Sequence, residues 1–118
     1  MQNQFQDLKV WQKARVLVKK VYETTKKFPS DELYGLTSQM RRAAVSVPLN
    51  IAEGTGRYHK KEYTHFLYMA RGSIYELLTL ILLAADLEYL QEPEAEMLSE
   101  SSGEITAMLN GLIKSLRL

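Results

Sequence analysis

Apolar residues recur at intervals of three and four along most of the chain, which is the spacing of amphipathic helices. From about Asp7 to Phe28 this spacing places nine side chains on one face, which we expect to be buried: Val10, Trp11, Ala14, Leu17, Val18, Val21, Tyr22, Thr25 and Phe28. Pro29 follows, and the residue before a proline is pushed out of helical geometry. The pattern therefore predicts a first helix over about 7–28.

A second helix is predicted to start at Asp31 or at Leu36 and to end at Gly54, because glycine most easily takes the left-handed turn past a helix end. A helix of a monomeric bundle needs only one apolar face. This helix has two, so we expect it to be covered on more than one side. The core face carries Leu36, Met40, Ala43, Ala44, Val47 and Ile51, and the far side carries Val45, Leu49 and Ala52.

A polar stripe runs between these two apolar faces, again at spacings of three and four: Gln39, Arg42, Ser46, Asn50 and Glu53. Its members can hydrogen-bond to each other, so we expect bonds within the bundle or across a subunit interface. Because an unpaired buried charge is costly, Glu53 is predicted to pair with Arg41 or Arg42 of its own chain or of a neighbour.

The same spacing predicts a third helix over about 60–90 and a fourth over about 94–116, with Pro93 between them. From Leu77 to Ala85 the third helix is apolar on nearly all sides, which again implies burial on several sides. No segment alternates with the period of a strand. The sequence thus predicts an all-α, antiparallel up-down-up-down four-helix bundle that assembles as a homo-oligomer.

The chain has 118 residues and no cysteine, which suits one domain over 1–118 and excludes disulfides and thiolate metal sites. The N-terminus lacks the basic-then-apolar pattern of a signal peptide. The longest apolar run, Leu77 to Ala85, is far shorter than the roughly 20 residues of a membrane span. We expect a soluble, cytoplasmic protein with no membrane partner.

Charge is distributed unevenly, although the net charge is only +1. Residues 1–61 contain twelve Lys and Arg against five Asp and Glu, and residues 62–118 contain three against nine. Clustered cations on a rigid face suit phosphate binding, although the pI near 7.9 is below the value of about 9 typical of dedicated binders. The candidate nucleic-acid-binding residues are Lys9, Lys13, Lys20, Lys27, Arg57, Lys60 and Lys61.

The basic face of the first helix has an alternative partner, an acidic ridge on the fourth helix formed by Glu96, Glu100 and Glu104. If the lysines lay against the ridge of an adjacent subunit, the contact would be head-to-tail, which is the kind that closes a ring.

Glu62 and His65 have the Glu-x-x-His spacing of ferritin-like dimetal sites, which need a second copy of the motif and two further carboxylates. This chain has one copy, so we expect His65 to be partly buried beside Phe66 instead. Neither a glycine-rich phosphate loop nor a Ser-His-acid set can be argued from spacing, and there is no cysteine nucleophile. The sequence therefore predicts no catalytic residues, no metal, no cofactor and no enzymatic activity.

Four segments together resemble the signature of one small bacterial family. They are Arg41 to Gly54, which reads Arg-Arg-Ala-Ala-Val-Ser-Val-Pro-Leu-Asn-Ile-Ala-Glu-Gly, and residues 7–14, 34–39 and 62–73. From about Phe5 to Leu90 the chain is similar to the four-helix bundle proteins encoded within intervening sequences of 23S ribosomal RNA genes (S23-like proteins). That family is similar in turn to the accessory variability protein of diversity-generating retroelements.

The resemblance implies a four-helix bundle that forms pentameric rings and is associated with ribosomal RNA genes and retroelement RNA. It also implies RNA or DNA as a partner and, by analogy, a protein partner such as a reverse transcriptase. We expect a non-enzymatic oligomer, a pentamer, that binds RNA through the basic face of its first helix. The alternative is an oligomeric protein-interaction scaffold with no direct nucleic-acid binding.

Overall fold

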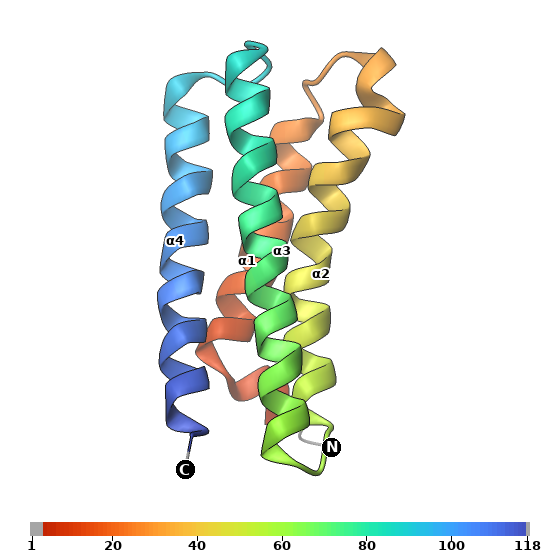
Figure 1. Ribbon diagram of the computed structural model, residues 1–118. Helices are drawn as coiled ribbons and strands as arrows, with labels where there is room; N and C mark the ends of the chain where they lie inside the picture. The colour runs from red at the N-terminus through yellow and green to blue at the C-terminus, as the bar shows by residue number, and fades with distance from the viewer. Residues whose placement is uncertain (1–3, 118) are drawn as a thin grey trace.

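The computed structural model describes residues 4–117, and this part of the chain is helical, with no strand. Its four α-helices are α1 (Lys9–Thr25), α2 (Ser38–Thr55), α3 (Lys60–Asp86) and α4 (Glu92–Ser115). They stand side by side, with α1 and α3 each packed on both α2 and α4. The start of α1, the α2–α3 loop and the end of α4 lie at one end of the bundle, and the other two connections lie at the opposite end (Figure 1).

The core receives mostly small and aliphatic side chains from all four helices. The expected core face of the first helix is confirmed, with one exception: Tyr22 is 39% exposed. Tyr22 lies at the edge of the bundle, where the Arg41 guanidinium stacks 4.6 Å from the centre of its ring. The expected core face of α2 is also confirmed: Met40, Ala43, Ala44, Val47 and Ile51 are buried and Leu36 is partly buried.

The first helix is shorter than the predicted range 7–28. Gln4–Asp7 forms a separate 3-10 helix, and Leu8 after it has an extended backbone (φ −74°, ψ 126°). At its other end α1 stops at Thr25, whose hydroxyl donates to the Val21 carbonyl at 2.8 Å. Hydrogen bonds from threonine hydroxyls to the main chain compete with helical geometry, which fits an early end.

The second helix begins at Ser38, later than both expected starts, Asp31 and Leu36. The preceding segment, Leu33–Thr37, is a π-helical turn in which Gly35 leaves helical geometry (φ −112°, ψ −114°). The break at Gly35 therefore separates the capping residues from the regular helix. Residues 33–37 still lead directly into α2, so a start at Leu36 is the nearer of the two predictions.

Glu32 holds this connection in place with both carboxylate oxygens. Its Oε1 accepts the Leu36 N–H at 3.1 Å, and its Oε2 accepts the Tyr89 hydroxyl at 3.1 Å. The hydrogen bond to Glu32 raises the pKa of Tyr89, because a nearby carboxylate disfavours a phenolate. Glu32 thereby ties the α1–α2 connection to the α3–α4 connection.

The second helix ends one residue past the predicted end at Gly54, but Gly54 lies inside α2 and does not take the expected left-handed turn. The helix continues to Thr55, and Gly54 is buried. A Cβ on Gly54 would lie 2.8 Å from the Tyr63 ring and 3.1 Å from the Phe66 Cβ. The glycine therefore serves close packing of α2 on the start of α3. Burial in this contact raises the pKa of Tyr63.

The third helix ends at Asp86, short of the predicted end. A Schellman motif closes it: the Tyr89 N–H donates to the Ala84 carbonyl at 2.9 Å, and the Glu88 N–H donates to the Ala85 carbonyl at 3.0 Å. Glu88 has φ 65°, in the left-handed region that favours glycine. Because a glutamate occupies this position, no glycine marks the helix end in the sequence.

Within residues 4–117, α3 is the one helix long and apolar enough to cross a membrane by length and composition. The prediction considered only the apolar run Leu77 to Ala85, which is shorter than the apolar part of this helix. A core helix of a soluble protein passes the same test, and α3 packs its buried face on α2 and α4. The absence of a membrane partner stays a prediction.

Gly54→Ala is expected to lower the free energy of unfolding by about 1–3 kcal/mol, because the added methyl group overpacks the contact with Tyr63 and Phe66. Alanine is otherwise the better helix former by about 1 kcal/mol. Gly103→Ala is the control, since its added Cβ meets nothing within 4 Å, and it should raise stability. Urea unfolding followed by circular dichroism measures both. A Gly54→Ala variant as stable as the parent would contradict this packing.

Glu88→Gly is expected to raise the free energy of unfolding by about 1 kcal/mol, because glycine takes the left-handed conformation without a steric cost. Asp86→Gly, at the last residue of α3, is the control and should lower it by up to about 1 kcal/mol, because Asp86 has helical geometry. Thermal unfolding measures both. Destabilisation by Glu88→Gly would show that its side chain matters more than its backbone.

Candidate nucleic-acid interface

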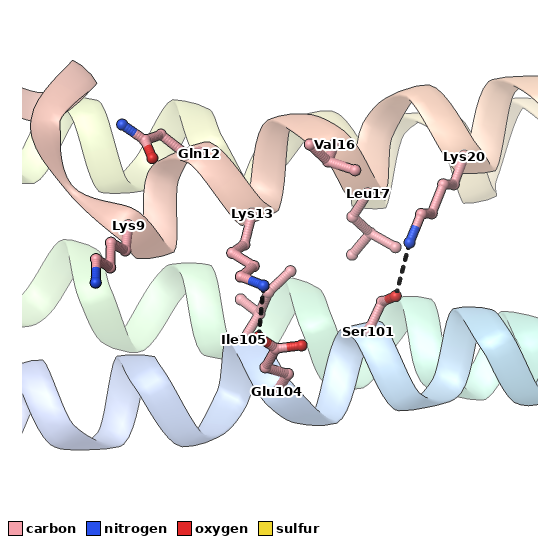
Figure 2. A pocket seen from close by; sticks show the side chains of 9 residues that line it. All are labelled: Lys9, Gln12, Lys13, Val16, Leu17, Lys20, Ser101, Glu104 and Ile105. Atoms are coloured by element: carbon pink, nitrogen blue, oxygen red, sulfur yellow. Dashed lines mark hydrogen bonds and ion pairs between the residues drawn. The ribbon is translucent and has the colours of Figure 1, made fainter.

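The lysines of α1 line a groove of about 490 Å³ between α1 and α4, which we call the α1–α4 groove. Lys9, Lys13 and Lys20 stand along the α1 side (Figure 2). Leu17 and Ile105, both buried, lie beneath them. The groove therefore has an apolar floor and a basic rim.

Two of these lysines contact α4 of the same chain (Figure 2). Lys13 Nζ lies 2.8 Å from Glu104 Oε1, and Lys20 Nζ donates to Ser101 Oγ at 3.3 Å. The Lys13 and Glu104 side chains are 52% and 53% exposed. Ion pairs so exposed stabilise a protein by only about 0–1 kcal/mol, so Lys13 can exchange its partner for another anion at little cost.

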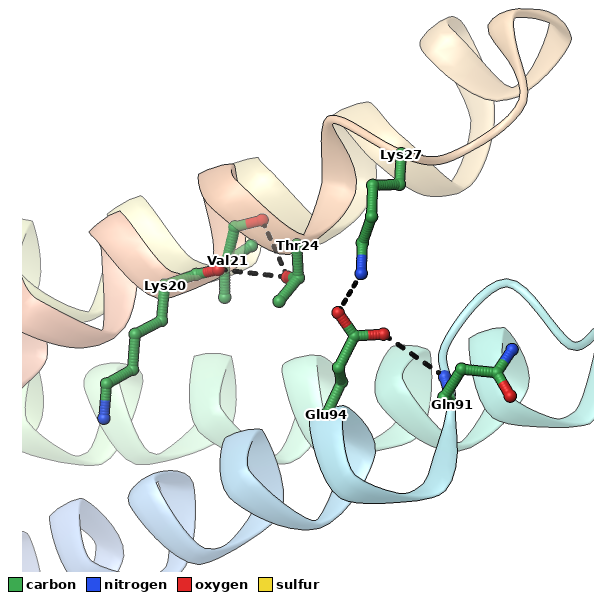
Figure 3. A network of polar contacts seen from close by, with 6 residues as sticks. All are labelled: Lys20, Val21, Thr24, Lys27, Gln91 and Glu94. Atoms are coloured by element: carbon green, nitrogen blue, oxygen red, sulfur yellow. Dashed lines mark hydrogen bonds and ion pairs between the residues drawn. The ribbon is translucent and has the colours of Figure 1, made fainter.

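Lys27 forms an ion pair with Glu94 near the start of α4 (Figure 3). Glu94 Oε1 also accepts the Gln91 N–H at 3.4 Å, within a capping box that begins α4 at Glu92, before the predicted start at 94. The hydrogen bond from Lys27 lowers the pKa of Glu94, since it favours the charged carboxylate. Like Lys13, Lys27 therefore already has a carboxylate partner, Glu94, within the same chain.

The packing of α1 on α4 brings together charges that the sequence keeps in separate halves. Glu104, one member of the predicted acidic ridge, pairs with Lys13 of its own chain. Glu96 and Glu100 have no ion-pair partner among residues 4–117. The pairing that the alternative placed across a subunit interface is therefore formed in part inside one bundle.

The other three predicted residues, Arg57, Lys60 and Lys61, lie at the α2–α3 loop and are exposed; we call them the bundle-end cluster. Arg57 Nη2 donates to Glu53 Oε2 at 3.0 Å, and its guanidinium stacks 4.6 Å from the centre of the Phe66 ring. Lys60 and Lys61 have no ion-pair partner in the part of the chain described here. The cluster therefore keeps two uncompensated positive charges.

The end of α4 borders this cluster. Lys60 and Lys61 line a shallow groove together with His65, Tyr68 and Leu116. The predicted basic residues thus lie in three places: Lys9, Lys13 and Lys20 in the α1–α4 groove, Arg57, Lys60 and Lys61 at this end of the bundle, and Lys27 at the opposite end beside Glu94. Lys114, in the last turn of α4, adds a further cation at this end of the bundle.

The opposite end of the bundle is acidic. Its two connections and the helix ends beside them hold a large share of the carboxylates of the chain: Asp31, Glu32, Asp86, Glu88, Glu92, Glu94 and Glu96. The fold thus converts an uneven charge distribution along the sequence into a difference between the two ends of the molecule.

Tyr58 was not among the predicted site residues, yet it lies within the bundle-end cluster and is 92% exposed. Its ring meets the ring of His59 edge-on, with centres 4.9 Å apart. The sequence feature that could have identified Tyr58 is the segment from Arg57 to Lys61, in which two aromatic residues stand between basic ones.

Three members of the polar stripe of α2, Ser46, Asn50 and Glu53, bond within the bundle. Ser46 Oγ lies 2.8 Å from Ser73 Oγ of α3, and Asn50 Nδ2 donates to the Ser46 carbonyl at 2.9 Å. Gln39 and Arg42 line an outer groove where α2 meets Glu76 of α3. The stripe therefore marks the boundary between α2 and α3.

Within the chain, the predicted pairing of Glu53 with Arg41 or Arg42 is wrong. Glu53 pairs with Arg57, one turn away, whereas Arg41 donates to Thr25 Oγ1 at 2.9 Å. At 1.5 Å per residue, Glu53 and Arg42 stand about 16 Å apart along α2, beyond the reach of their side chains.

Two apolar surfaces remain exposed on the bundle. The α2 groove, of about 550 Å³, is lined on its apolar parts by Tyr22, Leu33, Tyr34, Val45 and Leu49. The α3 outer stripe consists of exposed side chains one to two turns apart: Tyr68, Met69, Tyr75, Leu82 and Leu83. Leu49 is 59% and Leu82 is 63% exposed. The two helices that were predicted to be apolar on more than one side, α2 and α3, therefore do present apolar residues to solvent.

No group of three or more His, Asp or Glu that could hold a metal ion occurs within residues 4–117. Glu62 and His65 are both exposed. The expected partial burial of His65 is therefore wrong, because its ring only meets the edge of Phe66, with centres 5.8 Å apart, at the surface of the bundle.

Among solved structures, this chain is similar to a protein of unknown function from the S23 ribosomal protein family of Bacteroides thetaiotaomicron VPI-5482. The TM-score is 0.80 at 20% sequence identity, and the alignment covers 89% of this chain and 98% of the other. No curated protein matches the sequence. The family model described as 23S rRNA-intervening sequence protein matches residues 6–111, and the chain therefore belongs to that family.

Proposed function

We propose that the protein is a non-enzymatic, cytoplasmic RNA-binding protein that acts as a homo-oligomer. The observation that carries this proposal is the gathering of exposed cations from α1, the α2–α3 loop and α3 at one end of the bundle. Lys60 and Lys61 there have no ion-pair partner within residues 4–117. Lysine and arginine clustered on rigid helices bind the phosphates of nucleic acids, and their affinity then depends on salt.

The bundle-end cluster is the primary contact in this proposal, and the α1–α4 groove is the secondary one. Lys13 of the groove is already paired with Glu104, so it gains less from a phosphate than Lys60 or Lys61 does. The family description refers to a 23S rRNA intervening sequence, which supports RNA over DNA.

The two apolar surfaces support the homo-oligomer. The α2 groove and the α3 outer stripe are different surfaces of the bundle, and exposed apolar patches commonly mark interaction sites. A contact between unlike surfaces is heterologous, and it generates a ring when the rotation between neighbouring copies closes. We therefore propose that up-down-up-down bundles assemble in this way, with the pentamer implied by the resemblance as the expected ring.

Replacing Lys60 and Lys61 together with Gln is expected to weaken binding to single-stranded RNA and to reduce the slope of log affinity against log salt by about 1.4, because two phosphate contacts are lost. The control is Lys13→Gln with Lys27→Gln, which removes the same charge from lysines already paired with α4. Fluorescence anisotropy across a salt series measures both. A larger loss in the control would place the binding surface on α1.

Leu49→Glu and Leu82→Glu are each expected to lower the oligomeric state without loss of helicity, because a charge in an apolar interface is costly. Val16→Glu is the matched control, since Val16 is 52% exposed on α1, outside both surfaces. Light scattering gives the mass and circular dichroism the helicity. A parent protein with the monomer mass of 13.6 kDa at micromolar concentration would contradict the oligomer.

The α2 groove favours a second candidate function, a protein-interaction scaffold. Arg41 and Arg42 stand beside its apolar lining, which suits an acidic and apolar segment of a partner protein. A reverse transcriptase is such a partner by family analogy. An assembled parent protein that binds no RNA at low salt would favour this candidate.

A further inference from the structure

Tyr58 presents an open aromatic ring beside the bundle-end cluster. It is 92% exposed, so it contributes almost nothing to the core. Its ring contacts the ring of His59 edge-on, which leaves a face of the tyrosine ring available. Proteins that bind single-stranded nucleic acids stack bases on exposed aromatic rings of this kind, which lie beside positively charged side chains.

The loop that carries Tyr58 is held in place. The Arg57 N–H donates to the Gly54 carbonyl at 3.1 Å. The Arg57 side chain is fixed between Glu53 and the ring of Phe66. Because the loop is short and anchored, a partner that stacks on Tyr58 orders few additional groups, which lowers the entropy cost of binding.

Building on the proposed function, we infer that the bundle-end cluster binds single-stranded RNA, with an unpaired base stacked on Tyr58 and the neighbouring phosphates held by Lys60 and Lys61. A basic surface combined with an aromatic platform is how proteins hold single strands. In a duplex the bases are stacked on each other, so they offer no free face to a tyrosine.

Tyr34 shows which part of this arrangement matters. It is also 92% exposed, but it lies at the opposite end of the bundle, where Arg41 and Arg42 line the α2 groove with it and Asp31 and Glu32 are close in sequence. There the two carboxylates offset the charge of the two arginines, whereas Lys60 and Lys61 beside Tyr58 have no ion-pair partner within residues 4–117 and attract a phosphate backbone. The two tyrosines therefore share their exposure and differ in their charge environment, which makes them a matched pair.

The test uses the full chain and labelled oligo(U), oligo(dT) and duplex RNA, each of about 12 nucleotides per strand. Tyr58→Leu is expected to lower the affinity for oligo(U) by about 5- to 100-fold, the range that loss of one stacked base gives. Duplex affinity and the salt slope should stay unchanged, because the lysines are intact. Tyr34→Leu should change no affinity more than about twofold, compared at equal oligomeric state because Tyr34 lines the α2 groove.

The same loss is expected with oligo(dT), because stacking uses the base and not the 2′-hydroxyl. A loss confined to RNA would indicate a sugar contact and overturn the stacking. If the parent binds oligo(U) and Tyr58→Leu binds it equally well, the stacking is wrong and the proposed function stands. If the parent binds neither oligo(U) nor duplex RNA, the proposed function itself fails.

A direct readout places a tryptophan at the site. Trp11 is the single tryptophan of the chain, so Tyr58→Trp in a Trp11→Phe background reports on position 58 alone. Oligo(U) is expected to quench its fluorescence, whereas Tyr34→Trp in the same background should show no quenching. Quenching of equal size at both positions would contradict the inference.

Discussion

The close packing of α2 on the start of α3 is the contact on which the candidate site depends. Gly54 has no side chain, and this lets Tyr63 and Phe66 lie directly against the last turns of α2. The same contact fixes the Phe66 ring, on which Arg57 stacks, and sets the short loop that carries Tyr58. A packing requirement in the core thus determines how the basic and aromatic side chains are presented at the surface.

Electrostatics acts on this bundle at two scales. Locally, α4 supplies anions to nearby lysines, with Glu104 facing Lys13 of α1 and Glu94 facing Lys27 just past the end of α1. An exposed pair such as Lys13–Glu104 is easily exchanged. Over the whole molecule, carboxylates gather at one end and uncompensated cations at the other. The modest net charge hides this separation, which explains why a nearly neutral chain can still have a basic surface.

Periodicity predicted the buried faces well because burial of apolar side chains is the dominant favourable contribution to folding, and helical spacing alone decides which side chains share a face. Helix ends were harder, because they depend on single residues in unusual roles. Glu88 adopts a left-handed backbone conformation that glycine usually adopts, and Gly54 is a glycine inside a helix, where it serves close packing. The candidate cations were visible in sequence, but their partners were not, since Lys13 and Glu104 are far apart in the chain.

The separation of charge between the ends of the bundle has a geometric consequence for any ring with rotational symmetry. Rotation about a single axis gives every protomer the same orientation relative to that axis. If the long axes of the bundles do not lie in the plane of the ring, all basic ends are therefore on one face of the ring and all acidic ends on the other. Such a disc has two unlike faces. A single strand following the basic face would meet several copies of the same weak site in succession, and the linked contacts would add up to an avidity that one bundle lacks.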